Sequence, residues 1–350
     1  MSVARRSAAA PPGISIAAVY MLAVGLAAVV TGGFIAAFGA NPLVALGTIL
    51  RASLGSTTGF AQTLNKTTPL LLGSLAVALA MRGGFFNIGV DGQIYAGAIS
   101  ATGTAFLLGT IGLPGPPAVA AVLAAGVAGG IVFGGLPALL RARWGVNEIF
   151  VTVMLNFVAL FLTEYLTTGP WNDPMAGEAI SRPIPAAANL PMLMPQGGAH
   201  TGILLALACT LAGGWTMSRT WWGYRIRAAG DNPVAAHLGG VNLAAIALGT
   251  LTASGALAGL AGAIEVAGVH DRLILGLSPG YGLLAILIAV LSRGTAAGLM
   301  GTSFAFAALL VGSDSLQRSI ALPASAVYVF QAIVVLCVLL GGTSRLGRRG

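Results

Sequence analysis

Few residues in this sequence have the types and spacing that chemistry requires. The three histidines, His200, His237 and His270, lie far apart, and none sits in an HExxH or equivalent metal-binding spacing. The single lysine, Lys66, follows Asn65, so the chain has no Gly-Lys pair with which to bind ATP phosphates. We therefore expect no catalytic residue, no metal site, no cofactor and no ATPase activity in the chain itself.

The most polar stretch beside a hydrophobic run is residues 82–93, RGGFFNIGVDGQ. Asn87 can cap the helix that follows, and Asp91 is favoured near the positive end of a helix dipole. The glycines permit close backbone approach or an unwound turn. Either this is a tightly packed helix start, or it is a half-helix that lines a translocation path. On the second reading Asn87, Asp91 and Gln93 are candidate path residues.

A second group of polar residues begins the hydrophobic run 148–168. Asn147 is a plausible N-cap and precedes Glu148. Thr152 and Asn156 are four residues apart, so they share one helix face. A polar stripe on an apolar helix faces other helices or a wet path, not lipid. Asn147, Glu148 and Asn156 are therefore further path candidates, with interhelical hydrogen bonding as the alternative.

The inner connection 219–240 contains TWWGYRIRAAGDNPVAAHLGG. Its Asn232-Pro233 pair can start a short helix, with Asn232 or Asp231 as the cap and Pro233 at the first helical position. Such a segment is either an amphipathic interfacial helix or a coupling helix that inserts into a partner protein.

Four side chains of this connection would serve a coupling role. Ala235 and Ala236 would give the short helix a slim docking surface. Arg225 and Arg227 could pair with acids of a partner or with lipid phosphates.

The elements that carry these residues must lie in a membrane. The chain has 350 residues, of which 57% are hydrophobic and only 7% are charged, and its mean hydropathy is +0.91. A soluble domain carries about 25% charged residues. The 51 glycines suit closely packed membrane helices. We expect an all-α polytopic protein of about ten spans: 14–38, 64–81, 88–109, 116–140, 148–168, 201–218, 241–267, 279–292, 295–312 and 322–341.

Basic residues orient these spans. With the N-terminus inside, twelve of the 17 basic residues fall in inner connections and five in outer ones. This predicts cytoplasmic tails at 1–13 and 342–350 around a permease domain at 14–341. The five outer residues are Arg51, Lys66, Arg182, Arg272 and Arg318. The inner residues are Arg5, Arg6, Arg82, Arg141, Arg143, Arg219, Arg225, Arg227, Arg293, Arg345, Arg348 and Arg349.

The outer connection 169–200 is rich in proline, which predicts an ordered surface loop or lid without a long helix. The third and eighth spans are Gly-rich and could be broken or partial helices. They begin with related turns, Asn87-Ile-Gly and Ser278-Pro-Gly, a weak sign of an inverted repeat. Glycines at four-residue spacing in 126–134 and 255–259 predict helix packing. We expect the Glu265 side chain to form a local ion pair or to extend toward the membrane surface. We expect Cys209 and Cys337 to be small core residues.

These features leave three classes open. The chain could be the permease of an ATP-driven importer, or an ion-coupled secondary transporter or channel for a small polar solute. An intramembrane enzyme has little support, because the chain shows no metal-ligand cluster or paired carboxylates. The arginines do not cluster with aromatic residues, so no nucleic-acid partner is expected.

Five segments resemble one family: FNIGVDGQ, NEIFVTVMLNFVALFLTEYL, GYRIRAAGDNPVAAHLGGVN, SGALAGLAGAIEVAG and GYGLLAILIAVL, in that order over about 60–341. The chain is similar to permease subunits of bacterial ABC importers for nucleosides or simple sugars, a group that resembles the ribose and branched-chain amino acid permeases. The sequence departs from the family where Asp91 replaces a usual Glu, and at 292–298, SRGTAAG. The GPWNDP start of the outer loop favours the nucleoside branch.

The resemblance implies a type II-like permease fold in the bacterial plasma (inner) membrane, with both termini cytoplasmic. It implies three protein partners: an ABC ATPase subunit, an extracytoplasmic substrate-binding lipoprotein, and a second permease in a hetero-dimer. Membrane lipid surrounds the chain. The resemblance also implies the residues of the loop that docks on the ATPase, namely Gly230, Asn232, Pro233, Ala235, Ala236 and Gly239.

Overall fold

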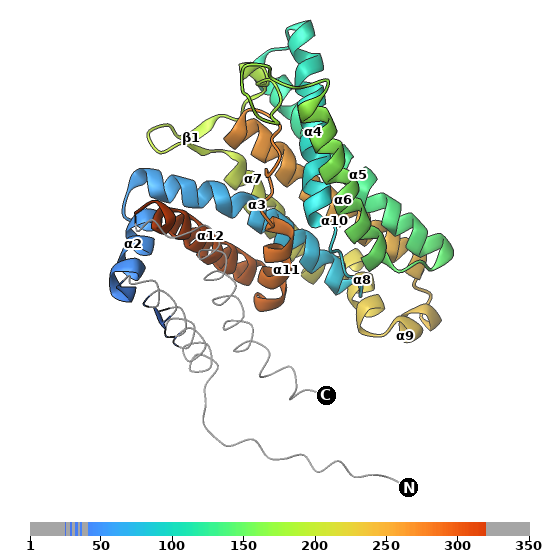
Figure 1. Ribbon diagram of the computed structural model, residues 1–350. Helices are drawn as coiled ribbons and strands as arrows, with labels where there is room; N and C mark the ends of the chain where they lie inside the picture. The colour runs from blue at the N-terminus through green and yellow to red at the C-terminus, as the bar shows by residue number, and fades with distance from the viewer. Residues whose placement is uncertain (1–24, 26–28, 30–31, 34–35, 37–40, 320–350) are drawn as a thin grey trace. The chain divides into compact units, whose positions relative to one another are not determined.

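The computed structural model describes residues 25, 29, 32–33, 36 and 41–319 (Figure 1). The chain divides into two units, one of Ile49–Gly312 and one of Met1–Thr48 with Ser313–Gly350, and the candidate site lies in the first. Six of the described helices are long and apolar enough to cross a membrane. The helices are α2 (Pro42–Leu54), α3 (Thr57–Arg82), α4 (Val90–Ile111), α5 (Gly115–Trp144), α6 (Glu148–Thr168), α7 (Gly202–Arg219), α8 (Trp221–Asp231), α9 (Pro233–Leu238), α10 (Leu243–Glu265), α11 (Tyr281–Leu291) and α12 (Ala296–Ser319).

Eight of the ten predicted spans coincide with helices, namely α3 to α7 and α10 to α12. The run 322–341, with Cys337, lies outside the described residues, as does 14–38 apart from a few helical positions. Helix α2 was not predicted from the sequence, because residues 42–54 lie between the first two apolar runs. The Asn41 side chain accepts the Leu43 N–H and so starts α2. Its 13 residues are about 20 Å long, too short to span a bilayer.

The two Gly-rich runs differ from each other in structure. The third forms α4, which continues without a break for 22 residues, so the expectation of a broken helix there is wrong. Its glycines instead pack against other helices: a Cβ on Gly97 would lie 2.1 Å from the Gly259 carbonyl oxygen. The eighth forms α11, which has only 11 residues and is a partial helix, as expected.

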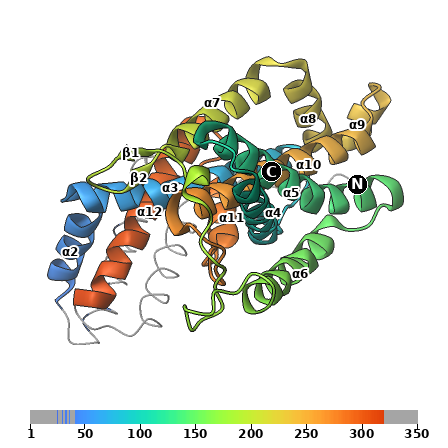
Figure 2. The same cartoon turned by 90° about the horizontal axis from the view of Figure 1, so that it is seen from above.

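Close backbone contact between α5 and α10 forms the centre of the larger unit, with α4 packed beside both (Figures 1 and 2). A Cβ on Gly130 would lie 2.1 Å from the carbonyl oxygen of Gly255, and a Cβ on Gly259 would lie 2.3 Å from that of Gly126. Only glycine allows this approach. The prediction that both glycine series mark helix packing is confirmed.

The outer connection 169–200 is an ordered loop without a long helix, as predicted. It contains a 3₁₀ turn (Ala186–Ala188) and two short antiparallel strands, β1 (Met192–Met194) and β2 (Ala199–His200). The Leu190 N–H donates to the Ala267 carbonyl at 2.7 Å, which fixes the loop to the end of α10. Helices α8 and α9 lie at the opposite end of α10 (Figure 1).

Two ionisable groups near this loop have local partners. Glu265 pairs with His270 across the π-helical turn Val266–His270, with 3.4 Å between Oε2 and Nε2, so the expected local pair is confirmed. His200 is buried, and burial lowers its pKa to about 4. Its Nδ1 accepts the Gly202 N–H at 3.1 Å, as a neutral imidazole can.

Candidate translocation and coupling site

The polar stretch 82–93 forms a bend between α3 and α4, which we call the elbow (residues 83–89). Helix α3 ends where the Gly83 N–H donates to the Ala80 carbonyl at 3.0 Å. Gly84 has φ +82°, a left-handed conformation that glycine adopts at little cost. The elbow lies at the end of the unit that also carries α8 and α9.

Inside the elbow, Asn87 is fully buried in a network of amides. Its Nδ2 donates to Gln93 Oε1 and to Ser254 Oγ, each at 2.8 Å. The Ser254 hydroxyl in turn donates to the Ala76 carbonyl at 2.7 Å. The N-cap of α4 is Gly89, whose N–H Asn87 accepts, so Asn87 supports the cap position without occupying it. The network joins α3, α4 and α10.

The carboxylate of Asp91 joins the start of α4 to the start of α11. Its Oδ1 accepts the Gly282 N–H at 2.8 Å and the Ser278 hydroxyl. A Cβ on Gly282 would lie 2.5 Å from Asp91 Oδ2, so a side chain there would displace the carboxylate. A negative charge between two helix N-termini is favourable for both dipoles. The first turn of α4, which follows the Asn87 turn, therefore contacts the Ser278 turn and the start of α11.

Ser278 also occupies the centre of Gly276–Gly280, which has the Gly-x-Ser-x-Gly spacing of a nucleophile elbow. In that motif a histidine accepts the serine proton. Here the hydroxyl donates to a carboxylate, and no histidine is among its hydrogen-bond partners in the described chain. Ser278, just before α11, thus donates a hydrogen bond that helps to hold the Asp91 carboxylate in place. The sequence did not indicate this role.

The polar face of α6 holds the elbow from the other side. Asn156 Oδ1 accepts the Gly92 N–H at 2.8 Å, and its Nδ2 donates to the Ile88 carbonyl at 3.0 Å. Thr152 is buried, and a Cβ on Gly89 would lie 2.8 Å from its Cβ. Both contacts are those of interhelical hydrogen bonding and packing, the alternative that the sequence left open.

The N-cap and the first residue of α6 are two more of the predicted residues. Asn147 is exposed and caps α6 by accepting the Ile149 N–H at 2.9 Å, as predicted. Glu148 is buried; its Oε1 accepts the Phe86 N–H of the elbow at 3.3 Å. Its Oε2 lies 3.6 Å from Arg141 Nε, which ties the end of α5 to the same carboxylate.

The inner connection folds as the sequence predicted. Asn232 Oδ1 accepts the Ala235 N–H at 3.0 Å, and Pro233 is the first residue of α9. In α8 the Arg225 guanidinium carbon lies 4.3 Å from the centre of the Trp221 ring, a cation–π contact that holds both side chains.

The surface that α9 presents differs from the expected one. Ala236 is only 7% exposed and packs into a core cluster with Ile226, Val241 and Ile246, so its side chain faces the protein core and not the exposed side of α9. The exposed apolar residues are Val234 at 70% and Leu238 at 84%, with Ala235 beside them. Their i, i+4 spacing was readable from the sequence, but which face turned inward was not.

A backbone contact connects α8 to the elbow. A Cβ on Gly230 would lie 2.3 Å from the Arg82 carbonyl oxygen and 3.1 Å from the Gly84 nitrogen. Helix α8 therefore packs directly on the peptide groups that end α3. Through the elbow this contact continues to Asn156, Glu148 and Asp91.

Comparison with known proteins decides among the classes left open. The family described as branched-chain amino acid transport system / permease component matches residues 59–339. The chain belongs to this permease family. It is therefore a multi-pass plasma-membrane subunit of an ABC importer, without enzymatic activity, and it works with a separate ATPase and a substrate-binding protein. The reading as an ion-coupled carrier or channel is not favoured.

Three relatives show how far the similarity extends. The chain is 34% identical over 325 residues to the glucose ABC transporter permease protein TsgB13 of Haloferax volcanii, covering 90% of this chain and 85% of the relative. It is 31% identical over 285 residues to the guanosine permease NupP of Bacillus subtilis, with 79% and 80% covered. It is 27% identical over 308 residues to the nucleoside permease NupB of Lactococcus lactis, with 85% and 84% covered. No solved structure matches the chain.

Proposed function

We propose that this permease passes a nucleoside or simple sugar from an extracytoplasmic lipoprotein receptor, and that it pairs with a second, different permease. The observation that carries the mechanism is the backbone contact of Gly230 with the elbow. A chain that cannot use ATP must receive movement from its ATPase mechanically. Movement of α8 and α9 then reaches the starts of α4 and α11 without a flexible linker.

We propose ten spans with both termini cytoplasmic, within a permease domain at 14–341 and tails at 1–13 and 342–350. Support comes from the end of the unit that carries α8 and α9. In the described chain this end gathers Arg82, Arg141, Arg219, Arg225 and Arg227, whereas Asp173 and Asp271 lie at the outer loop. The hydrogen bonds of Asp91 that join the starts of α4 and α11, the two Gly-rich runs with related first turns, are the support for the inverted repeat.

The six predicted path residues act at the wall of the path in this proposal. Each of them has a hydrogen-bond partner within the described chain, so their role is to hold the elbow and the helix starts beside the solute. These residues are Asn87, Asp91, Gln93, Asn147, Glu148 and Asn156.

The docking segment on the ATPase is α8 with α9. The proposed contacts are the exposed apolar pair Val234 and Leu238, with Ala235 between them. Arg227 offers a charge to acids of the ATPase or to lipid phosphates, whereas Arg225 is engaged by Trp221. The remaining docking residues shape the segment: Gly230 at the elbow, Asn232 and Pro233 at the start of α9, Ala236 in its core and Gly239 at its end.

Substrate class is tested by competition in the assembled importer. We expect uptake of a labelled nucleoside into proteoliposomes to require ATP and to fall strongly with excess unlabelled nucleoside, because both compete for the same site. Excess glucose tests the sugar alternative in the same assay. Competition by leucine with no effect of nucleosides or glucose would contradict the proposed substrates.

Asn156→Leu tests the wall. Leucine removes the hydrogen bond to the elbow and the one to the first turn of α4, and leaves the Ile88 carbonyl and the Gly92 N–H without these partners, at a cost of about 1–3 kcal/mol each. We expect transport to fall strongly while the permease still assembles with its ATPase. Met154→Leu, on the exposed face of the same helix, is the matched control. Wild-type transport by Asn156→Leu would show that the elbow does not depend on this amide.

A further inference from the structure

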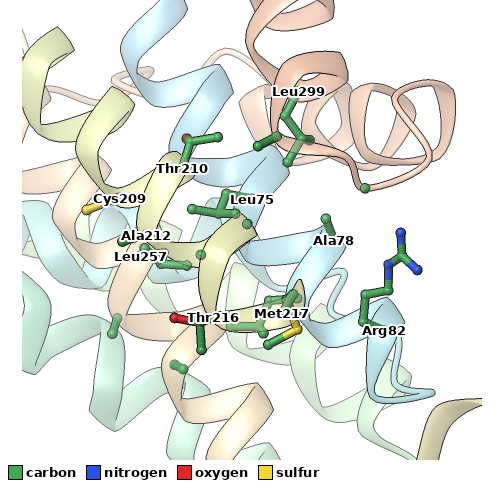
Figure 3. Close-up of a pocket in the computed structure, with 17 residues that line it drawn as sticks. Leu75, Ala78, Arg82, Cys209, Thr210, Ala212, Thr216, Met217, Leu257 and Leu299 are labelled. Carbon is green, nitrogen blue, oxygen red and sulfur yellow. The ribbon is translucent and has the colours of Figure 1, made fainter. Parts of the chain in front are cut away.

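An open groove runs along the surface of the larger unit between α3, α7, α10 and the start of α12 (Figure 3). Its volume is about 360 Å³, within the range of ligand sites. Its wall is almost entirely apolar and includes Leu75, Leu79, Met217, Leu257 and Leu299.

The groove has a cationic end. Arg82 closes α3, and Figure 3 shows its guanidinium beyond the apolar side chains. Its Nη2 donates to the Arg293 carbonyl at 2.8 Å, which fixes the guanidinium across the turn before α12. Arg219 ends α7 two residues after Met217, which lines the groove. Arg82, Arg219 and Arg293 are all exposed.

These three arginines have no recorded carboxylate partner in the part of the chain that the structure describes. All nine acidic residues of the chain fall within that part, between Asp91 and Asp314. The arginines therefore offer positive charge that this chain does not neutralise in the described structure. An apolar groove that ends at an unneutralised positive charge is complementary to a molecule with an acyl chain and an anionic head group.

We propose that this groove binds an anionic phospholipid, with one acyl chain along α3 and α7 and the phosphate at Arg82, the arginine that lines the groove. The surrounding bilayer is as apolar as the groove, so burial of the chain alone gives little preference. The preference comes from the head group, because basic pockets between helices at the cytoplasmic surface select anionic lipids. The assignment of this lipid to the cytoplasmic leaflet rests on the proposed function, because the arginines lie at the end of the unit that carries α8 and α9.

The site lies next to the coupling route. Arg82 holds the turn before α12 with its side chain, and its carbonyl oxygen faces Gly230 of α8. A phosphate on Arg82 would therefore brace the α3 end of the elbow. We accordingly expect the anionic lipid to raise coupled transport as well as to remain bound.

The test measures lipid retained by the full importer, extracted from membranes and analysed by native mass spectrometry. The complex is then placed in nanodiscs of phosphatidylcholine alone or of phosphatidylcholine with phosphatidylglycerol, and the lipid that it retains is measured again. We expect retained phosphatidylglycerol in wild type and at least a fivefold loss in Arg82→Gln. Ala212→Phe, which fills the groove and keeps every arginine, should cause the same loss. Arg143→Gln is the matched control, an exposed arginine at the end of α5 outside the groove.

Retention of phosphatidylcholine and phosphatidylglycerol to the same extent would overturn the role of the arginines. Unchanged lipid retention in Ala212→Phe would overturn the groove as the site. Retention requires no ATP and no substrate, so it is measured independently of uptake. If Arg82→Gln fails to assemble, Ala212→Phe still decides the question, because Ala212 lines the groove from α7 and lies outside the elbow.

Discussion

The substitution Leu238→Asp is expected to release the ATPase from the permease and to abolish transport. Leu238 and Val234 form an exposed apolar pair on α9, at 84% and 70%. An unpaired charge buried in a protein contact costs about 3–5 kcal/mol, equivalent to at least about a hundredfold loss of affinity. The measurement is co-purification of the ATPase with tagged permease, with uptake as the second readout.

Met175→Asp is the matched control for this substitution. Met175 is 94% exposed in the outer loop, so it adds the same charge at the opposite end of the unit. We expect the ATPase to stay bound in this variant. Ala236→Glu would be a poor test of docking, because the buried charge would disrupt the permease core itself. Full ATPase binding by Leu238→Asp would place docking elsewhere, with the α5 end at Arg141 and Arg143 as the next candidate.

The substitution Gly230→Ala is expected to separate ATP hydrolysis from transport. Its Cβ would lie 2.3 Å from the Arg82 carbonyl oxygen, a distance that requires α8 to move away from the elbow. The substitution does not alter the exposed residues of α9 that are proposed to dock, so the ATPase should still bind and hydrolyse ATP. We expect uptake to fall by about tenfold, because the coupling free energy between two sites is typically about 1–3 kcal/mol, equivalent to about 5- to 150-fold.

Gly301→Ala is the control for the loss of a glycine, since a Cβ there would meet nothing within 4 Å. Its uptake should match wild type. The informative quantity is the number of substrate molecules imported per ATP hydrolysed, which a simple folding defect would not change in the surviving complexes. An unchanged ratio in Gly230→Ala would show that the α8–elbow contact does not transmit movement.

The outcome at α9 shows where sequence reasoning stopped. Asn232 and Pro233 start the helix as predicted, because a cap and a proline act within a few residues of the chain. Which side of a six-residue helix is buried depends on what packs against it. Here Ile226 and Ile246, from helices on either side in the chain, enclose Ala236 and leave Leu238 outside.

The path residues show the same division. Their polarity beside apolar runs identified 82–93 and 147–156 from the sequence, and these two segments do meet in space. Their partners were not predictable, because they come from distant parts of the chain: Ser254 for Asn87, Gly282 for Asp91 and Phe86 for Glu148. With those partners, residues expected to face solute prove to be hydrogen-bonded within the protein.

The sequence by itself determined that this protein lies in a membrane, where most of its spans are, and to which family it belongs. Those properties depend on composition, on the length of apolar runs and on short ordered motifs, which are local in the chain. Only the tertiary structure decided that Gly230 touches the elbow, that Asp91 joins two helix starts, and that Arg82 ends an apolar groove. Each of these is a contact across more than a hundred residues of sequence, and its geometry is set by packing.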